Sequence, residues 1–211
     1  MKQEKKKRLG MVIDTRKCFD CKACMIACKV ENQLPPAYWR NWVLNDYRPG
    51  GRRTQFQPGQ CMQCQDPSCV AACPVGATYK RRQDGVVVVD PAKCIGCGNC
   101  VTACPYGARF RNPVTHRADK CDFCLHRLAR GQQPACVETC PTKARVFGDL
   151  DDPASPVSRL LKEEKTVSIR ALHVDTRPNI FYAGTSLLDW AGTPTLPGGV
   201  HMPPEFWKTT G

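Results

Sequence analysis

The sequence has no long hydrophobic run. Its longest aliphatic stretch is Val86 to Val89, far short of the roughly 18 apolar residues that a membrane-spanning helix needs. The N-terminal segment MKQEKKKRLG has five basic side chains and no apolar stretch, so we expect no secretory signal of its own. We therefore expect a chain that is soluble or peripheral to a membrane, and export alongside a partner stays open.

The sequence also lacks the residue patterns of common catalytic sites. It shows no Ser-His-Asp constellation, no phosphate-binding glycine loop and no paired catalytic carboxylates. We therefore expect that the chain alone turns over no substrate.

Cysteine is the residue in excess, with 16 in 211 positions. This is about 8%, near the level of a disulfide scaffold, but such scaffolds are short and secreted. The cysteines instead form an internal repeat of four groups. The groups are CFDCKACMIAC at 18–28, CMQCQDPSCVAAC at 61–73, CIGCGNCVTAC at 94–104 and CDFCLHRLARGQQPACVETC at 121–140.

Three thiolates at spacings near C-x2-C-x2-C can cap three corners of one 4Fe-4S cube, and in two-cluster ferredoxins the fourth cysteine ligates the other cluster. The neighbouring second and third groups would exchange their last cysteines across a hairpin. One predicted set is then Cys61, Cys64, Cys69 and Cys104, and the next is Cys94, Cys97, Cys100 and Cys73.

The first group is left to exchange with the fourth. The predicted sets are Cys18, Cys21, Cys24 and Cys140, and Cys121, Cys124, Cys136 and Cys28. Three groups end in Cys-Pro, whereas Lys29 follows Cys28. We interpret the proline as favouring a helix start after the cysteine and as dispensable for ligation. His126 and Arg127, inside the fourth group, are expected beside the ligands or on the surface; a Rieske-like nitrogen ligand is a minor alternative.

Zinc is the alternative metal, because C-x2-C pairs also form zinc knuckles and 16 cysteines could hold four such sites. Zinc pairs are usually a dozen or more residues apart, whereas three of these groups crowd four cysteines into 11 to 13 residues. We therefore favour iron–sulfur clusters.

Clusters also change the meaning of the net charge of +12, which would ordinarily suggest a nucleic-acid or membrane-surface partner. Four thiolates around a core of about +2 leave each site at roughly −2. Four such sites lower the total to about +4, so we expect no nucleic-acid partner.

The remaining segments give the fold class. We predict an α+β fold of small elements: two bacterial-ferredoxin-like modules of short antiparallel strands and short helices around 4Fe-4S clusters, with an extended C-terminal tail. Strands are expected at MVIDTRK, at 78–81 and 86–90 around an Asp84-Gly85 turn, at ARVFGDL and at VSIRALHV, with a helix at SPVSRLLKEEKT.

The predicted domains follow from these elements. They are an outer module (1–29 plus 105–150), an insertion (30–60), an inner module (61–104), a helix–strand extension (151–182) and a partner-binding tail (183–211).

Aromatic residues stand out in two of these segments. In the insertion, Trp39, Trp42 and Tyr47 are expected to cover a cluster rather than bind a base or substrate. Residues 176–211 show no period and little capacity to form a core, so they are expected to be disordered or to lie on another protein. Their expected anchors are Ile180, Phe181, Tyr182, Trp190, Phe206 and Trp207.

The chain resembles the four-cluster iron–sulfur subunits of the molybdopterin (dimethyl sulfoxide reductase) family, and is most similar to the electron-transfer subunit of polysulfide or thiosulfate reductase. The stretches that carry the resemblance are MVIDTRKCFDCKACMIACKVEN, QCMQCQDPSCVAACPVGATY, GVVVVDPAKCIGCGNCVTACPYGAR, KCDFCLHRLARGQQPACVETCPTKARVFGDLDDP and TRPNIFY. All four groups keep four cysteines. The residues at 34–57 and after 183 match less clearly.

The resemblance implies a relay of four 4Fe-4S clusters between two partners. These are a catalytic subunit with a molybdenum or tungsten bis-pterin cofactor and an integral membrane subunit that exchanges electrons with quinol. It also implies that the cluster on Cys18, Cys21, Cys24 and Cys140 is nearest the catalytic subunit and that the cluster on Cys94, Cys97, Cys100 and Cys73 faces the quinone side. The substrate would be polysulfide, thiosulfate or a related oxoanion.

The location implied by the resemblance is peripheral to the cytoplasmic membrane through these partners. We expect the extracytoplasmic face, by co-export with the catalytic subunit; the cytoplasmic face stays possible. The alternative function is a free-standing polyferredoxin that shuttles electrons between soluble enzymes, although a diffusing carrier has no use for an anchored tail.

Six basic residues beside the cysteine groups would raise cluster potentials if they pointed inward, or would be solvated if they did not. They are Lys17, Lys22, Lys93, Arg109, Arg111 and Lys120.

Overall fold

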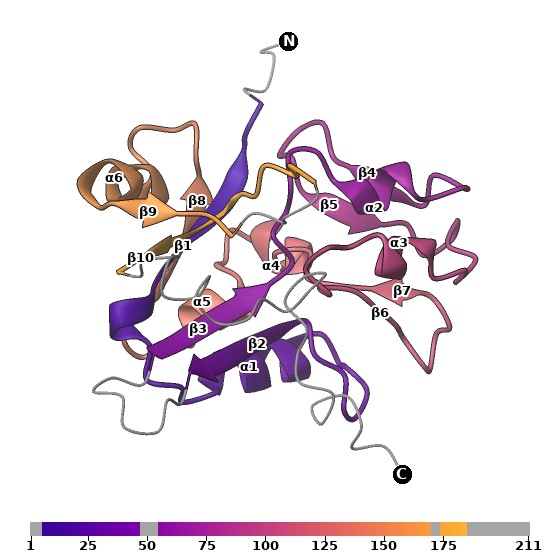
Figure 1. Cartoon of the computed structure of the whole chain (residues 1–211), viewed down its shortest axis with the longest axis horizontal. Helices are drawn as coiled ribbons and strands as arrows, with labels where there is room; N and C mark the ends of the chain where they lie inside the picture. Colours follow the sequence, from indigo (N-terminus) through magenta and orange to yellow (C-terminus); the bar gives the residue numbers. More distant parts are fainter. Residues whose placement is uncertain (1–5, 47–54, 170–173, 185–211) are drawn as a thin grey trace.

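The computed structural model describes residues 6–46, 55–169 and 174–184. Small strands and short helices make up these parts, in a mixed α/β arrangement (Figure 1). The strands are β1 (Leu9–Asp14), β2 (Asn41–Asp46), β3 (Gln55–Gln60), β4 (Thr78–Lys80), β5 (Val87–Val89), β6 (Phe110–Arg111), β7 (Ala118–Asp119), β8 (Arg145–Asp149), β9 (Thr166–Val167) and β10 (Ile180–Ala183). The helices are the 3-10 turn η1 (Thr15–Lys17), α1 (Ala23–Glu31), α2 (Ser68–Ala71), α3 (Asn99–Thr102), α4 (Leu125–Leu128), α5 (Ala135–Glu138) and α6 (Pro156–Glu163).

A four-stranded sheet in the order β8-β1-β10-β9 joins the start of the chain to its later part. β1 pairs antiparallel with β8 and parallel with β10, where Met11 faces Ile180. Helix α6 packs against β1 and β8 (Figure 1). The parallel pair departs from the predicted all-antiparallel pattern. It arises because β10 returns from a distant part of the sequence, not through a hairpin.

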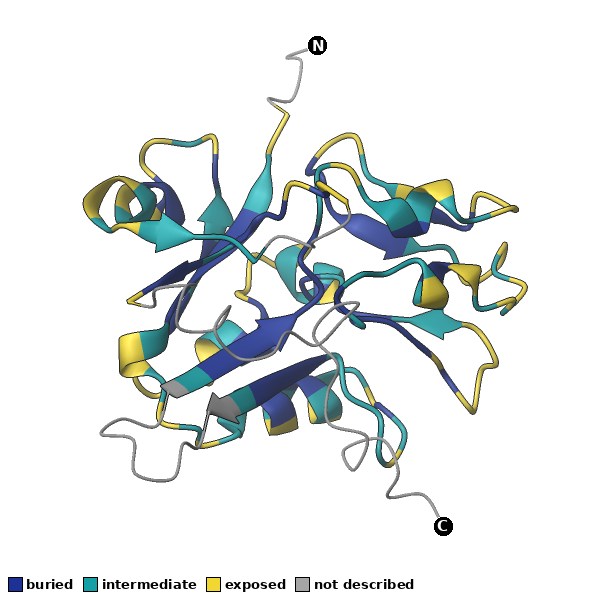
Figure 2. Cartoon of the chain, viewed as in Figure 1, coloured by how far each residue is buried: buried dark blue, intermediate teal, exposed yellow. Residues whose placement is uncertain are grey.

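The expectation that residues from 176 onward form a tail is wrong for 176–183. Ile180, Tyr182 and Ala183 are completely buried in a central strand, shown dark blue in Figure 2. A strand covered on both faces loses the alternation that usually identifies it. Residues 185–211, including Trp190, Phe206 and Trp207, lie outside the described residues.

The predicted hairpin between the second and third groups is present. β4 and β5 pair antiparallel, and Gly85 has a positive φ of 71° at the turn, a backbone conformation that glycine adopts readily. The hairpin β6–β7 lies beside α3 (Figure 1), and the Ala118 backbone N–H donates to Cys94 Sγ at 3.4 Å. This hairpin, assigned to the outer module, therefore contacts the third group, and the domain boundaries stay a prediction.

The insertion forms the antiparallel hairpin β2–β3. Trp42 and Val43 are buried in the main core together with Cys24 and Cys61. Lys29 Nζ lies over the Trp39 ring, 4.4 Å from the ring centre. Tyr47 lies outside the described residues. The hairpin thus covers the cysteine layer, as its aromatic residues predicted.

Other elements differ from the prediction in length. The strand expected at VSIRALHV is reduced to β9, which ends at Val167, and residues 170–173 of that segment lie outside the described residues. In the part of the chain that the structure describes, no helix is long and apolar enough to cross a membrane.

Candidate iron–sulfur sites

Cysteines from distant parts of the chain surround three cavities. The first is lined by Cys18, Cys21, Cys24 and Cys140. The second is lined by Cys28, Cys121, Cys124 and Cys136. The third is lined by Cys61, Cys64, Cys69 and Cys104. These are the sets that the spacing predicts, with the fourth cysteine of each supplied by another group.

The fourth predicted set combines Cys94, Cys97 and Cys100 with Cys73. Helices α2 and α3 touch, and Cys100 on α3 packs with Cys69 of α2. Cys73 lies two residues after the end of α2. Its assignment to this set still rests on the spacing argument.

The cavities suit a group larger than one ion. Each is lined by four cysteines that come from two different groups. Within the described ranges, no three Cys, His, Asp or Glu side chains converge as ligands of a single metal ion. Sulfur ligands spread around a cavity are the arrangement that a cube of iron and sulfide requires.

Burial keeps the thiols protonated when nothing positive lies beside them. It raises the pKa of Cys28 to about 12 and that of Cys64 to about 12, with neighbouring thiols adding to the shift. The same causes raise the pKa of Cys121 well above its ordinary value, and Cys61 of the third cavity is among its neighbours. A cationic iron core would reverse this penalty, because metal coordination deprotonates the thiol.

Hydrogen-bond donors point at several of these sulfurs. Backbone N–H groups of Thr78 and Phe123 donate to Cys73 Sγ at 3.4 Å and to Cys121 Sγ at 3.5 Å. Asn32 Nδ2 lies 3.5 Å from Cys28 Sγ. Such donors stabilise thiolate sulfur and help to set the reduction potential of a cluster.

The prolines after the fourth cysteines end helices and do not begin them, so this part of the prediction is wrong. Cys73, Cys104 and Cys140 each follow a four-residue helix, α2, α3 or α5, by two residues. The residue before a proline is driven out of helical geometry. Cys28 has no such proline, and α1 continues past it to Glu31.

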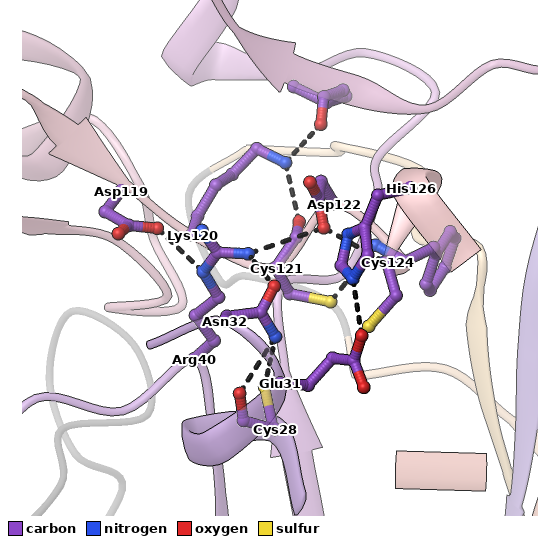
Figure 3. A network of polar contacts seen from close by, with 12 residues as sticks. Cys28, Glu31, Asn32, Arg40, Asp119, Lys120, Cys121, Asp122, Cys124 and His126 are labelled. Carbon is purple, nitrogen blue, oxygen red and sulfur yellow. Dashed lines mark hydrogen bonds and ion pairs between the residues drawn. The ribbon is translucent and has the colours of Figure 1, made fainter. Parts of the chain in front are cut away.

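The extra turn of α1 builds a polar network over the second cavity (Figure 3). Glu31 accepts hydrogen bonds from Arg127 and contacts His126 Nε2, both at 2.7 Å. Asn32 Oδ1 accepts from Arg40 Nη1 at 2.7 Å, and Arg40 Nε donates to Asp119 at 2.7 Å. His126 is therefore engaged with a carboxylate beside the site, as expected, and not with the cavity.

The segment before β10 closes the third cavity. Thr176 lines that cavity, and its Oγ1 lies 2.6 Å from the Tyr106 hydroxyl oxygen. The Asn179 backbone N–H donates to the Met62 carbonyl at 3.0 Å, and Asn179 Nδ2 donates to the Gln63 carbonyl at 2.8 Å. This contribution was missed because its composition is typical of a tail.

The basic residues beside the groups divide into two kinds. Arg109 and Lys120 are buried, whereas Lys17, Lys93 and Arg111 are exposed. Lys22 is partly exposed and pairs with Asp20. A further buried arginine, Arg145, was missed, although the repeats CPYGAR and CPTKAR place it and Arg109 five residues after a fourth cysteine.

Known proteins support this interpretation of the cavities. The family description "4Fe-4S dicluster domain" matches residues 17–77 and 52–150. The tetrathionate reductase B subunit of Salmonella typhimurium is 42% identical over 208 residues, which cover 95% of this chain and 80% of that protein. The chain belongs to this family of iron–sulfur reductase subunits.

Other members are similar over comparable lengths. The tetrathionate reductase B subunit of Archaeoglobus fulgidus is 47% identical over 86% of this chain and 84% of its own length. The corresponding polysulfide reductase protein of Wolinella succinogenes is 41% identical over 83% of this chain and 93% of its own length. This chain has two dicluster matches and 16 cysteines, and its cofactors are therefore four 4Fe-4S clusters.

Proposed function

We propose that the chain relays single electrons between a membrane quinol/quinone subunit and a catalytic subunit that carries a molybdenum or tungsten bis-pterin. The four predicted cysteine sets hold the four clusters of this relay. When bound, the clusters accept and release one electron each without breaking a bond. The chain's residues fix the order of the clusters, exclude water and stabilise charge.

Contacts between neighbouring sets support a linear order. Burial is the main cause of the raised pKa of Cys136 in the second set, and Cys24 of the first set lies close enough to contribute. Cys61 of the third set likewise contributes to the raised pKa of Cys121 in the second set. Cys69 of the third set and Cys100 of the fourth belong to one buried cluster. An electron entering one end can thus step through adjacent sets to the other.

Exposure at the two ends is the observation that carries the proposal. Of the 16 cysteines only Cys21 and Cys97 are exposed, and they belong to the first and last sets. Phe19, beside Cys21, is 55% exposed and Ile95, beside Cys97, is 65% exposed. In the third set the corresponding residue, Met62, is 1% exposed, and in the second set it is the acidic residue Asp122. Exposed apolar side chains at both ends suit two docked partners.

The relatives support subunit status over a free polyferredoxin, because their names describe them as components of reductases. By their names, tetrathionate or polysulfide is reduced by those complexes, and we propose a sulfur oxoanion or polysulfide here. Following the family resemblance, the Cys18 set faces the catalytic subunit and the Cys94 set faces the quinone subunit. Anchoring of residues 183–211 on the catalytic subunit stays a prediction.

A pair of surface variants tests the assignment. Phe19→Glu should slow reoxidation of the pre-reduced complex by substrate at least tenfold and leave reduction by quinol unchanged. Ile95→Glu should do the reverse. Both variants should retain about 16 iron per chain, as four cubes require. Equal effects of each variant on both half-reactions would contradict a relay with two dedicated ends.

A further inference from the structure

Three buried basic side chains have no carboxylate partner among the residues that the structure describes. Arg145 is 2% exposed, Lys120 is 3% exposed and Arg109 is 4% exposed. The described ion pairs involve other basic residues. Since a buried charge without a partner is costly, each of the three calls for an anion nearby.

Arg145 lies between the first and second sets. It lines the first cavity, and its Nη1 donates a 2.6 Å hydrogen bond to Gln60 Oε1; Gln60 lines the second cavity. Burial lowers the pKa of Arg145, but the thiols of Cys24 and Cys136, one from each set, raise it above its ordinary value. Because arginine stays protonated in proteins, this guanidinium is a positive charge placed beside two sets.

Arg109 occupies the matching place between the third and fourth sets. It lines the third cavity and its Nη1 donates to Thr78 Oγ1 at 3.2 Å. Burial lowers its pKa, but Cys69 and Cys61 of the third set and Cys100 of the fourth raise it above its ordinary value. The two arginines therefore serve the same position in the two pairs of groups.

Lys120 lies in the remaining interval, between the second and third sets. Its Nζ donates to the Cys121 carbonyl at 2.7 Å and to the Val87 carbonyl. Cys121 belongs to the second set, while Val87 lines the third cavity and packs with Cys69. Figure 3 shows the Lys120 side chain reaching past the Cys121 backbone.

Both arginines keep buried N–H groups with no hydrogen-bond acceptor in the described protein. These are Nε and Nη2 of Arg109 and Nη2 of Arg145. Buried polar groups of folded proteins nearly always have a partner. A cluster of roughly −2 with its thiolates provides both the acceptors and the counter-charge.

We propose that Arg145, Lys120 and Arg109 are the counter-charges of the relay, one in each interval between consecutive clusters, and that they raise the electron affinity of the clusters they separate. The inference rests on the proposed four-cluster relay. In each transfer one cluster loses an electron and its neighbour gains it, with no bond formed or broken. The same cation faces both donor and acceptor, so the extra negative charge keeps a stabilising partner throughout the step.

The repeats themselves provide a matched control. Lys17, Lys93 and Lys120 each precede the first cysteine of a group. Lys93 is 65% exposed and lies 3.8 Å from Asp90, so solvent and salt screen its charge. Lys93→Met and Lys120→Met therefore remove the same charge from the same repeat position, one on the surface and one in the interior.

The test is a dye-mediated redox titration of the anaerobically purified complex, followed by electron paramagnetic resonance. Arg145→Gln should make the first two clusters harder to reduce, Lys120→Met the middle two, and Arg109→Gln the last two. Each affected reduction equilibrium should fall roughly tenfold or more, because a nearby positive charge in the protein interior stabilises the added electron much more than it would in water. Lys93→Met and the charge-retaining Arg145→Lys should shift each equilibrium less than about threefold.

Unchanged equilibria in all three neutral variants, with iron retained, would overturn the proposal and leave these residues as space-filling. If Arg145→Gln loses iron, the iron content of Arg145→Lys is compared with it. Retention of iron in Arg145→Lys supports the proposal, because the positive charge is kept, and an equal loss of iron contradicts it. The titration requires neither quinol nor turnover by the catalytic subunit. Its outcome is therefore separable from that of the Phe19 and Ile95 variants, which test the proposed function.

Discussion

Cys28 and Cys140 occupy equivalent places in two cysteine groups but have different surroundings. After Cys140, Pro141 follows the end of α5, and the chain turns back over the sulfur. Burial raises the pKa of Cys140, but the Ala144 backbone N–H and the Thr142 side chain are among the donors that bring it below its ordinary value. The Cys-Pro turn thus surrounds a ligand sulfur with fixed donors.

Cys28 lies inside α1 and has no such turn. Its pKa is raised to about 12 by burial and by the nearby Cys136 and Cys124 thiols. Its side-chain donor is Asn32 Nδ2, which the uninterrupted helix positions. The first group therefore lacks the backbone donors of the Cys-Pro turn and has one more helical turn in their place. Glu31 on this turn binds His126 and Arg127 of the fourth group.

Converting the first group to the Cys-Pro form should have the largest effect on stability and iron content. Lys29→Pro places proline in the interior of α1, where it removes a hydrogen bond and clashes with the preceding turn at a cost of about 3 kcal/mol or more. The Glu31 and Asn32 contacts should be lost. We expect a lower melting temperature of the complex and a loss of roughly four iron per chain, measured by calorimetry and metal analysis.

Lys29→Ala is the control for this variant. It removes the Nζ hydrogen bonds to the Pro35 and Tyr38 carbonyls but keeps the helix. Equal stability and iron content of the proline and alanine variants would show that continuation of α1 is unimportant for the second cavity.

Removing one hydrogen-bond donor from each of the two cysteines should have a smaller effect, on the reduction equilibria of their clusters. Asn32→Ala removes the Cys28 donor, and the lost hydrogen bond is worth about 1 kcal/mol, or roughly fivefold in the reduction equilibrium of that cluster. Thr142→Ala removes only one of several donors to Cys140, so we expect a change of less than about twofold. Redox titration of each signal measures both, and a larger effect from Thr142→Ala would reverse the comparison.

The cysteine spacing predicted which cysteines lie together around three cavities, because ligation constrains spacing locally, and the ligation itself stays a prediction. Three cysteines on one loop can reach one cube, and the exchange of fourth cysteines agrees with the sets that line the three cavities. The Asp84-Gly85 turn was likewise readable from two residues.

What sequence reasoning missed depends on contacts between distant segments. β10 is a core strand only because β1 lies beside it, and no local pattern in TRPNIFYAG shows that pairing. The burial of Lys120 and the exposure of Lys93 are also invisible locally, because both precede a cysteine in the same way. The prediction for the prolines was wrong because each follows the end of a helix and does not begin one.

Paramagnetic resonance of three serine variants shows whether Cys28 ligates the cluster of the fourth group. Cys28→Ser and Cys124→Ser should alter the same cluster signal, while Cys21→Ser should alter a different one. Each variant should keep at least about 12 iron, from the three unaffected cubes. If Cys28→Ser and Cys21→Ser instead alter one common signal and Cys124→Ser another, the first group is self-contained and Cys28 does not serve the fourth group.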